Sequence, residues 1–169
     1  MCVFPRVKFS NHFLRGAPAG SNGTAHRSGW MTDENCPKFL EHFKLHVKPS
    51  KGVIVLILLE NHNSHLATEV LEFAEQNGVI LLSFPPHCSH KVQPLDISFF
   101  GPLKKRISQA QQNWLCCHPG QCMTIYDAPG TTGEAWKYTL TVGNITAGFG
   151  KAGIFPFNRD VFTLSLIHI

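Results

Sequence analysis

Two acidic residues come shortly after the two most apolar segments of the chain. Glu60 directly follows the run VIVLILL, and Asp96 ends the stretch PPHCSHKVQPLD, which begins just after the strand-like VILLS. The carboxyl ends of parallel strands lie at one edge of a sheet, so two carboxylates placed there can share a divalent cation. Two such cations can hold the attacking and leaving oxygens of a phosphoryl transfer. In the alternative interpretation, Glu60 is a solvated strand end and Asp96 caps a helix.

Histidines follow the same two apolar segments and offer a second kind of chemistry. His62 and His65 lie in NHNSH, and His87 and His90 lie in PPHCSH. Each pair has the spacing H-x-x-H, so the imidazoles could bind zinc, although neither pair has a zinc-finger spacing. The other interpretations are hydrogen bonds to the loop backbone and, for protonated rings, contacts to phosphate. The sequence leaves these alternatives open.

Three basic residues lie in a predicted helix. Apolar residues recur at intervals of three and four over residues 100–114, which predicts a helix, and a Gly-Pro pair must begin or kink it. Lys104, Lys105 and Arg106 lie largely off this apolar stripe. They can follow a phosphate backbone, and a solvated helix face is the other interpretation.

The composition allows one domain with its own core. The chain has 169 residues, of which 43% are hydrophobic and 15% are charged, and its net charge is +4. This small basic excess allows a nucleic-acid partner without requiring one. The six cysteines contain no C-x-x-C pair and the N-terminus resembles no signal peptide, so a reduced intracellular chain is predicted. The longest apolar run is far too short to cross a membrane, so no membrane partner is predicted.

The order of the elements predicts an α/β fold. Residues 53–59 and 79–84 are continuous apolar runs, typical of strands that are buried on both faces of a parallel or mixed sheet. A helical pattern over residues 66–77 separates them, with Ser64 as its predicted cap and Gly78 as its predicted end. Strand, helix and strand together predict a βαβ unit with parallel strands.

The rest of the chain has weaker signals. VFPRVKF predicts an edge strand or strand end, and the Gly- and Pro-rich RGAPAGSNGTAHRSG predicts an irregular loop. Thr32 is the predicted cap of a helix that extends to Val47, and Pro37 should weaken the first part of that helix. PPHCSHKVQPLD predicts a rigid loop, residues 135–140 a helix, and GFGKAGIFPFNRDVF an ordered tail.

An ordered series of motifs resembles one known family. The resemblance is to the DDE superfamily endonuclease domain, more narrowly to its pogo, Tigger and jerky-like transposase branch. It is carried by LILLENHNSH, NGVILLSFPPHCSHKVQPLD, FFGPLKK and GFGKAGIFPFNRDVF. FPRVKF, GAPAGSNGTAHRSGWMT and HPGQCMTIYD fit the same pattern in order. The resemblance covers roughly residues 3–163, and residues 1–163 are interpreted as a partial domain of this family.

The resemblance implies an RNase H-like fold, in which helices flank a mixed sheet. It implies three acidic residues that bind two Mg²⁺ or Mn²⁺ ions, which activate water and then a DNA 3′-hydroxyl for attack on phosphodiesters. By position, the second acid is Glu60 and the third is Asp96. The four histidines named above would lie beside the metal ligands or contact DNA. DNA as the partner, a homodimer of a full-length protein and a nuclear location are further implications.

Two departures from the family predict that the chain does not cleave DNA by itself. Glu60 stands where the family usually has aspartate, which moves the carboxylate outward by about 1.5 Å, whereas catalytic groups tolerate a displacement of only about 0.5 Å. The family's first acid lies upstream of the segment like VFPRVKF, so the chain is predicted to lack it, the first two strands and the N-terminal helix-turn-helix region. Asp33 is no substitute, because it aligns with a helix. Two alternatives remain, a domesticated non-catalytic DNA-binding or interaction protein and a zinc-stabilised binding module.

The C-terminal LSLIHI, Leu164 to Ile169, has no counterpart in that family. It is also one reading frame of a common transposase-based sequencing adaptor, so library read-through is our interpretation of these residues. Resequencing the locus across this junction tests the interpretation, and a genomic match through Ile169 would contradict it.

Overall fold

A computed structural model describes residues 1–60, 62 and 67–162 of the chain. The chain divides into two units, each with its own hydrophobic core. The first unit comprises Met1–Phe84 and Met123–Gly130, and the second comprises Pro85–Cys122 and the chain from Thr131 onward. The predicted six-residue tail lies outside the described residues.

The βαβ unit predicted from the sequence lies in the first unit. β3 (Val55–Leu59) and β4 (Val79–Ser83) are parallel neighbours, and α2 (Thr68–Asn77) lies between them in the chain. Gly78 ends α2 with a φ of 69°, a left-handed conformation that favours glycine. The predicted parallel pair and the predicted helix end are therefore confirmed. The predicted cap, Ser64, falls outside the described residues.

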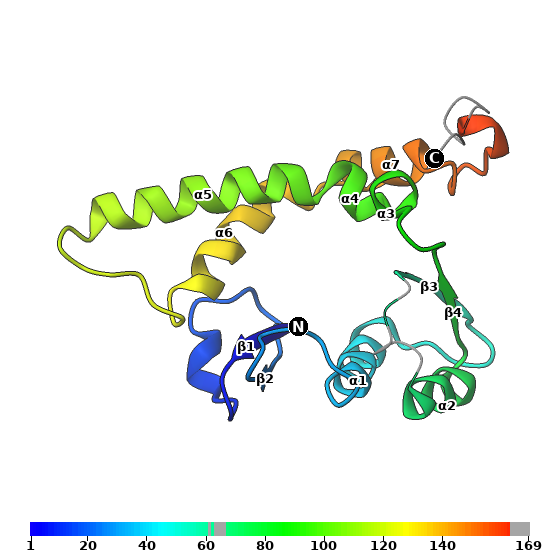
Figure 1. Cartoon of the computed structure of the whole chain (residues 1–169), viewed down its shortest axis with the longest axis horizontal. Coiled ribbons are helices and arrows are strands. Elements are labelled where there is room, and N and C mark those ends of the chain that lie inside the picture. The colour runs from blue at the N-terminus through cyan, green and yellow to red at the C-terminus, as the bar shows by residue number, and fades with distance from the viewer. Residues whose placement is uncertain (61, 63–66, 163–169) are drawn as a thin grey trace. The chain divides into compact units, whose positions relative to one another are not determined.

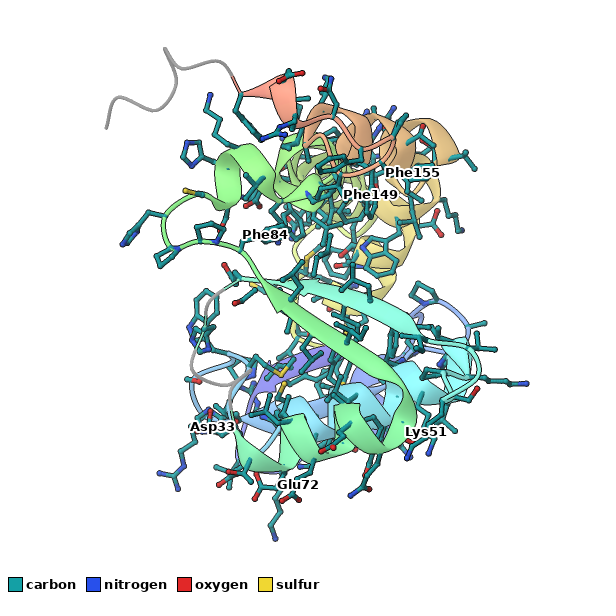
Figure 2. The ribbon with its side chains drawn as sticks, turned by 90° about the vertical axis from the view of Figure 1, so that its right-hand side faces the viewer. Asp33, Lys51, Glu72, Phe84, Phe149 and Phe155 are labelled. Atoms are coloured by element: carbon teal, nitrogen blue, oxygen red, sulfur yellow. The ribbon has the colours of Figure 1, made fainter. Side chains whose placement is uncertain are left out.

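One face of the β3–β4 pair carries the core of the first unit. α1 (Cys36–Val47) and α2 lie on the same side of the two strands, and Glu72 of α2 points away from them (Figure 2). The strands contribute alternate residues to this core, because successive side chains point to opposite faces. The buried members are Cys36, Leu40 and Val70, and partly buried Met31, Phe39, Ile57, Ala67, Phe73 and Leu81 pack against them.

The prediction that these strands are buried on both faces is wrong for the second face. Ile54 and Leu56 are 62% and 51% exposed, and Ile80 and Leu82 are 53% and 52% exposed. The physical reason is that the sheet has two strands and the helices of this unit cover only one of its faces. The continuous apolar runs therefore predicted the two strands correctly, but they did not predict that helices cover only one face of the sheet.

A second two-stranded parallel sheet lies near the N-terminus. β1 (Cys2–Pro5) pairs with β2 (Gly23–His26), as Figure 1 shows. β1 confirms the predicted strand, whereas the prediction of an irregular loop is wrong for β2. The Thr24 hydroxyl donates a 2.7 Å hydrogen bond to Asn35 Oδ1, and both residues are buried. This bond connects β2 to the beginning of α1.

Aromatic rings form a second apolar cluster in the first unit. Phe4 of β1 and Phe13 of the 3-10 helix η1 (Asn11–Leu14) have ring centroids 5.1 Å apart. Phe13 and Tyr126 have centroids 5.6 Å apart. Tyr126 belongs to the segment Met123–Gly130, so this contact explains why a distant part of the chain joins the first unit.

Helix α1 begins later than the sequence predicts. Its first residue is Cys36 and its cap residue is Asn35, while the Thr32 carbonyl accepts hydrogen bonds from the N–H groups of Asn35 and Cys36 at 3.0 and 2.9 Å. Thr32 therefore closes a turn before the helix. Pro37 lies in the first helical turn, where its missing N–H breaks no intrahelical bond. The predicted weakening by Pro37 is accordingly wrong.

The regular secondary structure in the described part of the second unit is helical. The predicted helix at residues 100–114 is confirmed as α5, and the one at 135–140 as the end of α6. The prediction of a rigid loop is wrong where α3 and α4 form. In Figure 1, α4 and α7 lie side by side, in agreement with their contacts. The elements are α3 (Ser89–Val92), α4 (Pro94–Ser98), α5 (Phe100–Cys117), α6 (Ala128–Thr139), α7 (Val142–Lys151) and the 3-10 helix η3 (Arg159–Val161).

The described residues thus form a mixed α/β structure with seven α-helices and two small parallel sheets. This agrees with the predicted α/β class. The finer prediction, an RNase H-like mixed sheet, stays a prediction.

Gly148 allows α7 to approach α4 closely. A Cβ atom added at Gly148 would lie 2.5 Å from Ser98 Oγ and 2.7 Å from the carbonyl oxygen of Pro94. The Ser98 hydroxyl also donates a 2.7 Å hydrogen bond to the carbonyl of Asn144. A side chain at position 148 would therefore separate the two helices and break this bond.

We expect Gly148→Ala to lower the free energy of unfolding by about 1–3 kcal/mol, the usual cost of overpacking. Urea denaturation of the whole chain measures it. Gly143→Ala is the matched control, because Gly143 is exposed in the same helix and its added Cβ would meet only Thr141 Oγ1, at 4.0 Å. The control should change stability by less than about 1 kcal/mol, in the stabilising direction. Equal destabilisation by both substitutions would contradict the close packing.

Candidate metal and nucleic-acid site

Glu60 comes directly after β3, at the carboxyl end of the β3–β4 pair. Leu59 is in register with Ser83, and the N–H of Phe84 donates a 2.7 Å hydrogen bond to the Leu59 carbonyl. Both strands therefore end at the same edge, as predicted. The Glu60 side chain is exposed, and its backbone carbonyl accepts a 2.8 Å hydrogen bond from the N–H of His62. Within residues 1–60, 62 and 67–162, no hydrogen bond or ion pair engages the Glu60 carboxylate.

Asp96 lies in the first turn of α4, which confirms its predicted place at a helix entrance. Its N–H donates a 3.1 Å hydrogen bond to the carbonyl of Gln93, the residue that precedes the helix. The alternative that Asp96 caps the helix is wrong, because the cap position belongs to Gln93 and no side chain forms a cap hydrogen bond there. Asp96 is exposed, and no described residue forms an ion pair with its carboxylate.

Each of these carboxylates fits the role of a metal ligand when taken by itself. Mg²⁺ prefers oxygen donors and binds through one or two carboxylates together with water and phosphate oxygens. Glu60 belongs to the first unit and Asp96 to the second, so their convergence on one ion stays a prediction. The described residues contain no group of three or more His, Cys, Asp or Glu side chains that could hold a metal ion.

The predicted histidines fall in different surroundings. His62 is exposed beside Glu60, and His65 lies outside the described residues. His87 and His90 are exposed before and within α3, and His87 has a left-handed φ of 62°, a conformation that histidine adopts more readily than most residues. A zinc site formed by all four histidines includes His65, so this alternative stays a prediction.

The three basic residues lie on the exposed face of α5, as the helical pattern predicts. The opposite face packs into the core of the second unit, which consists of Phe99, Leu103 and Ala135 with Phe100 and Ile107 against them. Lys104, Lys105 and Arg106 are exposed, and none forms a salt bridge with an acidic residue in the described ranges. Their charges are therefore available to an external anion.

Tyr138 is a site residue that the sequence reasoning missed. The Arg106 guanidinium lies over its ring, 5.2 Å from the ring centroid, and Arg106 Nη1 donates a 3.3 Å hydrogen bond to Gln109 Oε1. A cation–π contact at an exposed position contributes about 0.5–1 kcal/mol, so it favours one orientation of Arg106. Tyr138 lies in α6, and no pattern in the sequence relates it to α5.

Lys137 differs from the basic residues of α5. Its ammonium lies 2.6 Å from Glu134 Oε1 one helical turn earlier. The hydrogen bond with Glu134, and then the negative charge of that carboxylate, raise the pKa of Lys137. Lys137 therefore stays charged but already has an anionic partner, which makes it less available to a phosphate than the neighbouring cluster.

Comparisons with known proteins agree with the motifs. Residues 12–149 match the family described as DDE superfamily endonuclease. A curated protein named MFS-type transporter clz9, from Cochliobolus lunatus, is 33% identical over 135 residues, which is 79% of this chain and 15% of that protein. The chain thus spans 15% of the length of this relative. No solved structure matches the chain. None of the helices within the described ranges is long and apolar enough to cross a membrane.

Proposed function

The chain belongs to the DDE superfamily endonuclease family, and from this premise we propose that it is a transposase-derived nuclease segment whose partner is DNA. The observation that supports DNA as the partner is the cluster of Lys104, Lys105 and Arg106. These cations are exposed, lie on one helix and have no acidic partner among the described residues. Cations in this arrangement bind a phosphate backbone and release its counterions. The assignment to the pogo, Tigger and jerky-like branch rests on the motifs quoted above.

Glu60 and Asp96 are the proposed metal ligands. Both carboxylates are exposed, and neither is engaged by a described residue, so either can bind a cation without breaking an interaction within the described ranges. Mg²⁺ and Mn²⁺ suit such oxygen donors. In a complete site of this family, such ions would supply activation of the attacking oxygen and stabilisation of the charge on the phosphate. His62, His87 and His90 are proposed to contact DNA or to hydrogen-bond the ligands.

We further propose that these 169 residues bind DNA without cleaving it. The family's chemistry uses three acids, and two of them have matches in this chain. Glu60 also carries its carboxylate about 1.5 Å farther out than the usual aspartate. A non-catalytic DNA-binding or interaction protein is the alternative for the whole protein, and it predicts the same behaviour for this chain.

A plasmid assay with Mg²⁺ or Mn²⁺ tests these statements. The purified chain should retard supercoiled plasmid on a gel and should produce no nicked or linear form above the metal-only control. Asp96→Ala, run in parallel, should behave in the same way. Metal-dependent nicking that disappears in Asp96→Ala would refute the proposed inactivity. An absence of DNA binding at low salt would refute the proposed partner.

We also propose a nuclear location, because DNA is the proposed partner, and a homodimer of the full-length protein, which the resemblance to the family implies. Fluorescence imaging of the tagged chain checks the location, and a purely cytoplasmic signal would contradict it. Light scattering on a full-length protein checks the dimer.

A further inference from the structure

Helix α1 carries two histidines on one face. His42 and His46 are four positions apart, so they are neighbours on the helix surface. Their ring centroids are 4.5 Å apart, with an angle of 64° between the ring planes. Both residues belong to the first unit and lie outside the set proposed for DNA or for the nuclease metal.

The ring of His46 is already oriented as that of a metal ligand would be. Its Nδ1 atom lies 2.9 Å from the backbone carbonyl oxygen of His42. A carbonyl can only accept, so Nδ1 carries a proton, and in the neutral form of this ring the lone pair is therefore on Nε2. Metal-binding histidines almost always donate their second ring N–H in this way, to a carbonyl or a carboxylate. The ring of His42 forms no hydrogen bond with any described residue, so its nitrogens are available as well.

The surroundings of the pair leave both rings accessible. His46 is exposed and His42 is half-buried. A Cβ atom at Gly20 would lie 3.0 Å from His46 Nε2, so the glycine leaves space where a side chain would cover this nitrogen.

We propose that His42 and His46 together bind one divalent transition-metal ion of the zinc, copper and nickel class. Two histidines at i and i+4 on a helix also form the zinc-binding pair of the H-E-x-x-H motif. Each Zn–N bond is about 2.0–2.1 Å long, so the two nitrogens must come within about 4 Å of each other. Rings with centroids 4.5 Å apart can meet this condition. Water completes the coordination.

The metal proposed for the His42–His46 pair differs from the metal proposed for Glu60 and Asp96, because the donor atoms differ. Imidazole nitrogen suits zinc, copper and nickel, whereas Mg²⁺ prefers oxygen ligands. The pair therefore selects a different metal from Glu60 and Asp96. Because the site requires a formed helix, an ion that binds it also stabilises the folded chain by mass action.

Isothermal titration of the whole chain with Zn²⁺, repeated with Ni²⁺, tests the proposal. His46→Gln and His42→Gln should each weaken metal binding at this site by at least about 10–100-fold. This is the usual loss of metal affinity when a residue that only hydrogen-bonds a metal ligand is replaced. The sharper variant is His46→Gln with Val47→His, which keeps the number of histidines but moves one of them off the face of His42. It should also lose the site.

Controls distinguish this site from other histidines. His87→Gln with His90→Gln removes an H-x-x-H pair and should leave this binding event unchanged. Circular dichroism of each variant should match that of the starting protein, and His46 is exposed, so its replacement should not affect folding. Zn²⁺ and Ni²⁺ binding that is equal in the starting protein, in His46→Gln and in the relocated variant would overturn the proposal. So would binding lost only with His87 and His90.

Discussion

Replacement of Lys104, Lys105 and Arg106 by glutamine is expected to weaken binding to duplex DNA by on the order of tenfold to a hundredfold near 0.1 M salt. The three side chains are exposed, and no acidic partner among the described residues neutralises them. Each lost phosphate contact should reduce the slope of log affinity against log salt by about 0.9. Fluorescence anisotropy with a labelled duplex at several salt concentrations measures both quantities.

A matched control variant tests whether DNA binding depends on the position of these charges on α5 or only on the net charge of the chain. Lys38, Lys48 and Lys51 are exposed residues of the first unit, and their replacement by glutamine removes the same amount from the net charge of +4. This control should lose less than about threefold in affinity and keep most of its salt slope, because long-range attraction between exposed charges is screened within about 10 Å at 0.1 M salt. If both variants weaken binding equally, α5 is not the surface that contacts DNA.

Local patterns explain which parts of the fold could be predicted. The parallel β3–β4 pair could be predicted from two apolar runs, the helical repeat between them and Gly78. Each of these signals lies within a few residues of the structure that it specifies. β2 was not predicted, because threonine is the only one of its four residues that favours strands, whereas glycine and alanine disfavour them. It forms by pairing with β1 and through the Thr24–Asn35 hydrogen bond, which are contacts between distant parts of the chain.

The candidate site divides in the same way. The strand end at Glu60, the helix entrance at Asp96 and the exposed face of α5 depend on local sequence, and all three were predicted. The contact between Arg106 and Tyr138 depends on how two helices pack, so no local pattern revealed it. The pair His42 and His46 is a different case. Its H-x-x-x-H spacing is visible in the sequence, but the distance between the two rings and the hydrogen bond of His46 Nδ1 depend on side-chain conformations that spacing does not determine.

Leu40→Ala is expected to lower the free energy of unfolding by about 2–5 kcal/mol, because it removes buried apolar packing and leaves a cavity. Leu40 is 2% exposed and belongs to the cluster with Cys36 and Val70 that holds α1 and α2 against the strands. Small domains are stable by only about 5–15 kcal/mol in total, so this loss can unfold much of the population. Urea denaturation gives the magnitude, and hydrogen exchange should show protection falling in α1 and α2.

Leu45→Ala provides the same chemical change on the same helix at a position that is 71% exposed. It removes little buried surface, so its effect on the free energy of unfolding should stay within about 0.5 kcal/mol. A large difference between the two substitutions would establish which face of α1 the core uses.

The Leu45→Ala variant also serves as a control for the metal experiment, because Leu45 and the His42–His46 pair lie on one helix. Zn²⁺ should stabilise Leu45→Ala as much as the unchanged chain, since neither histidine is altered. If both leucine substitutions had equal effects, the burial assigned to α1, and with it the face that presents the two histidines, would be incorrect.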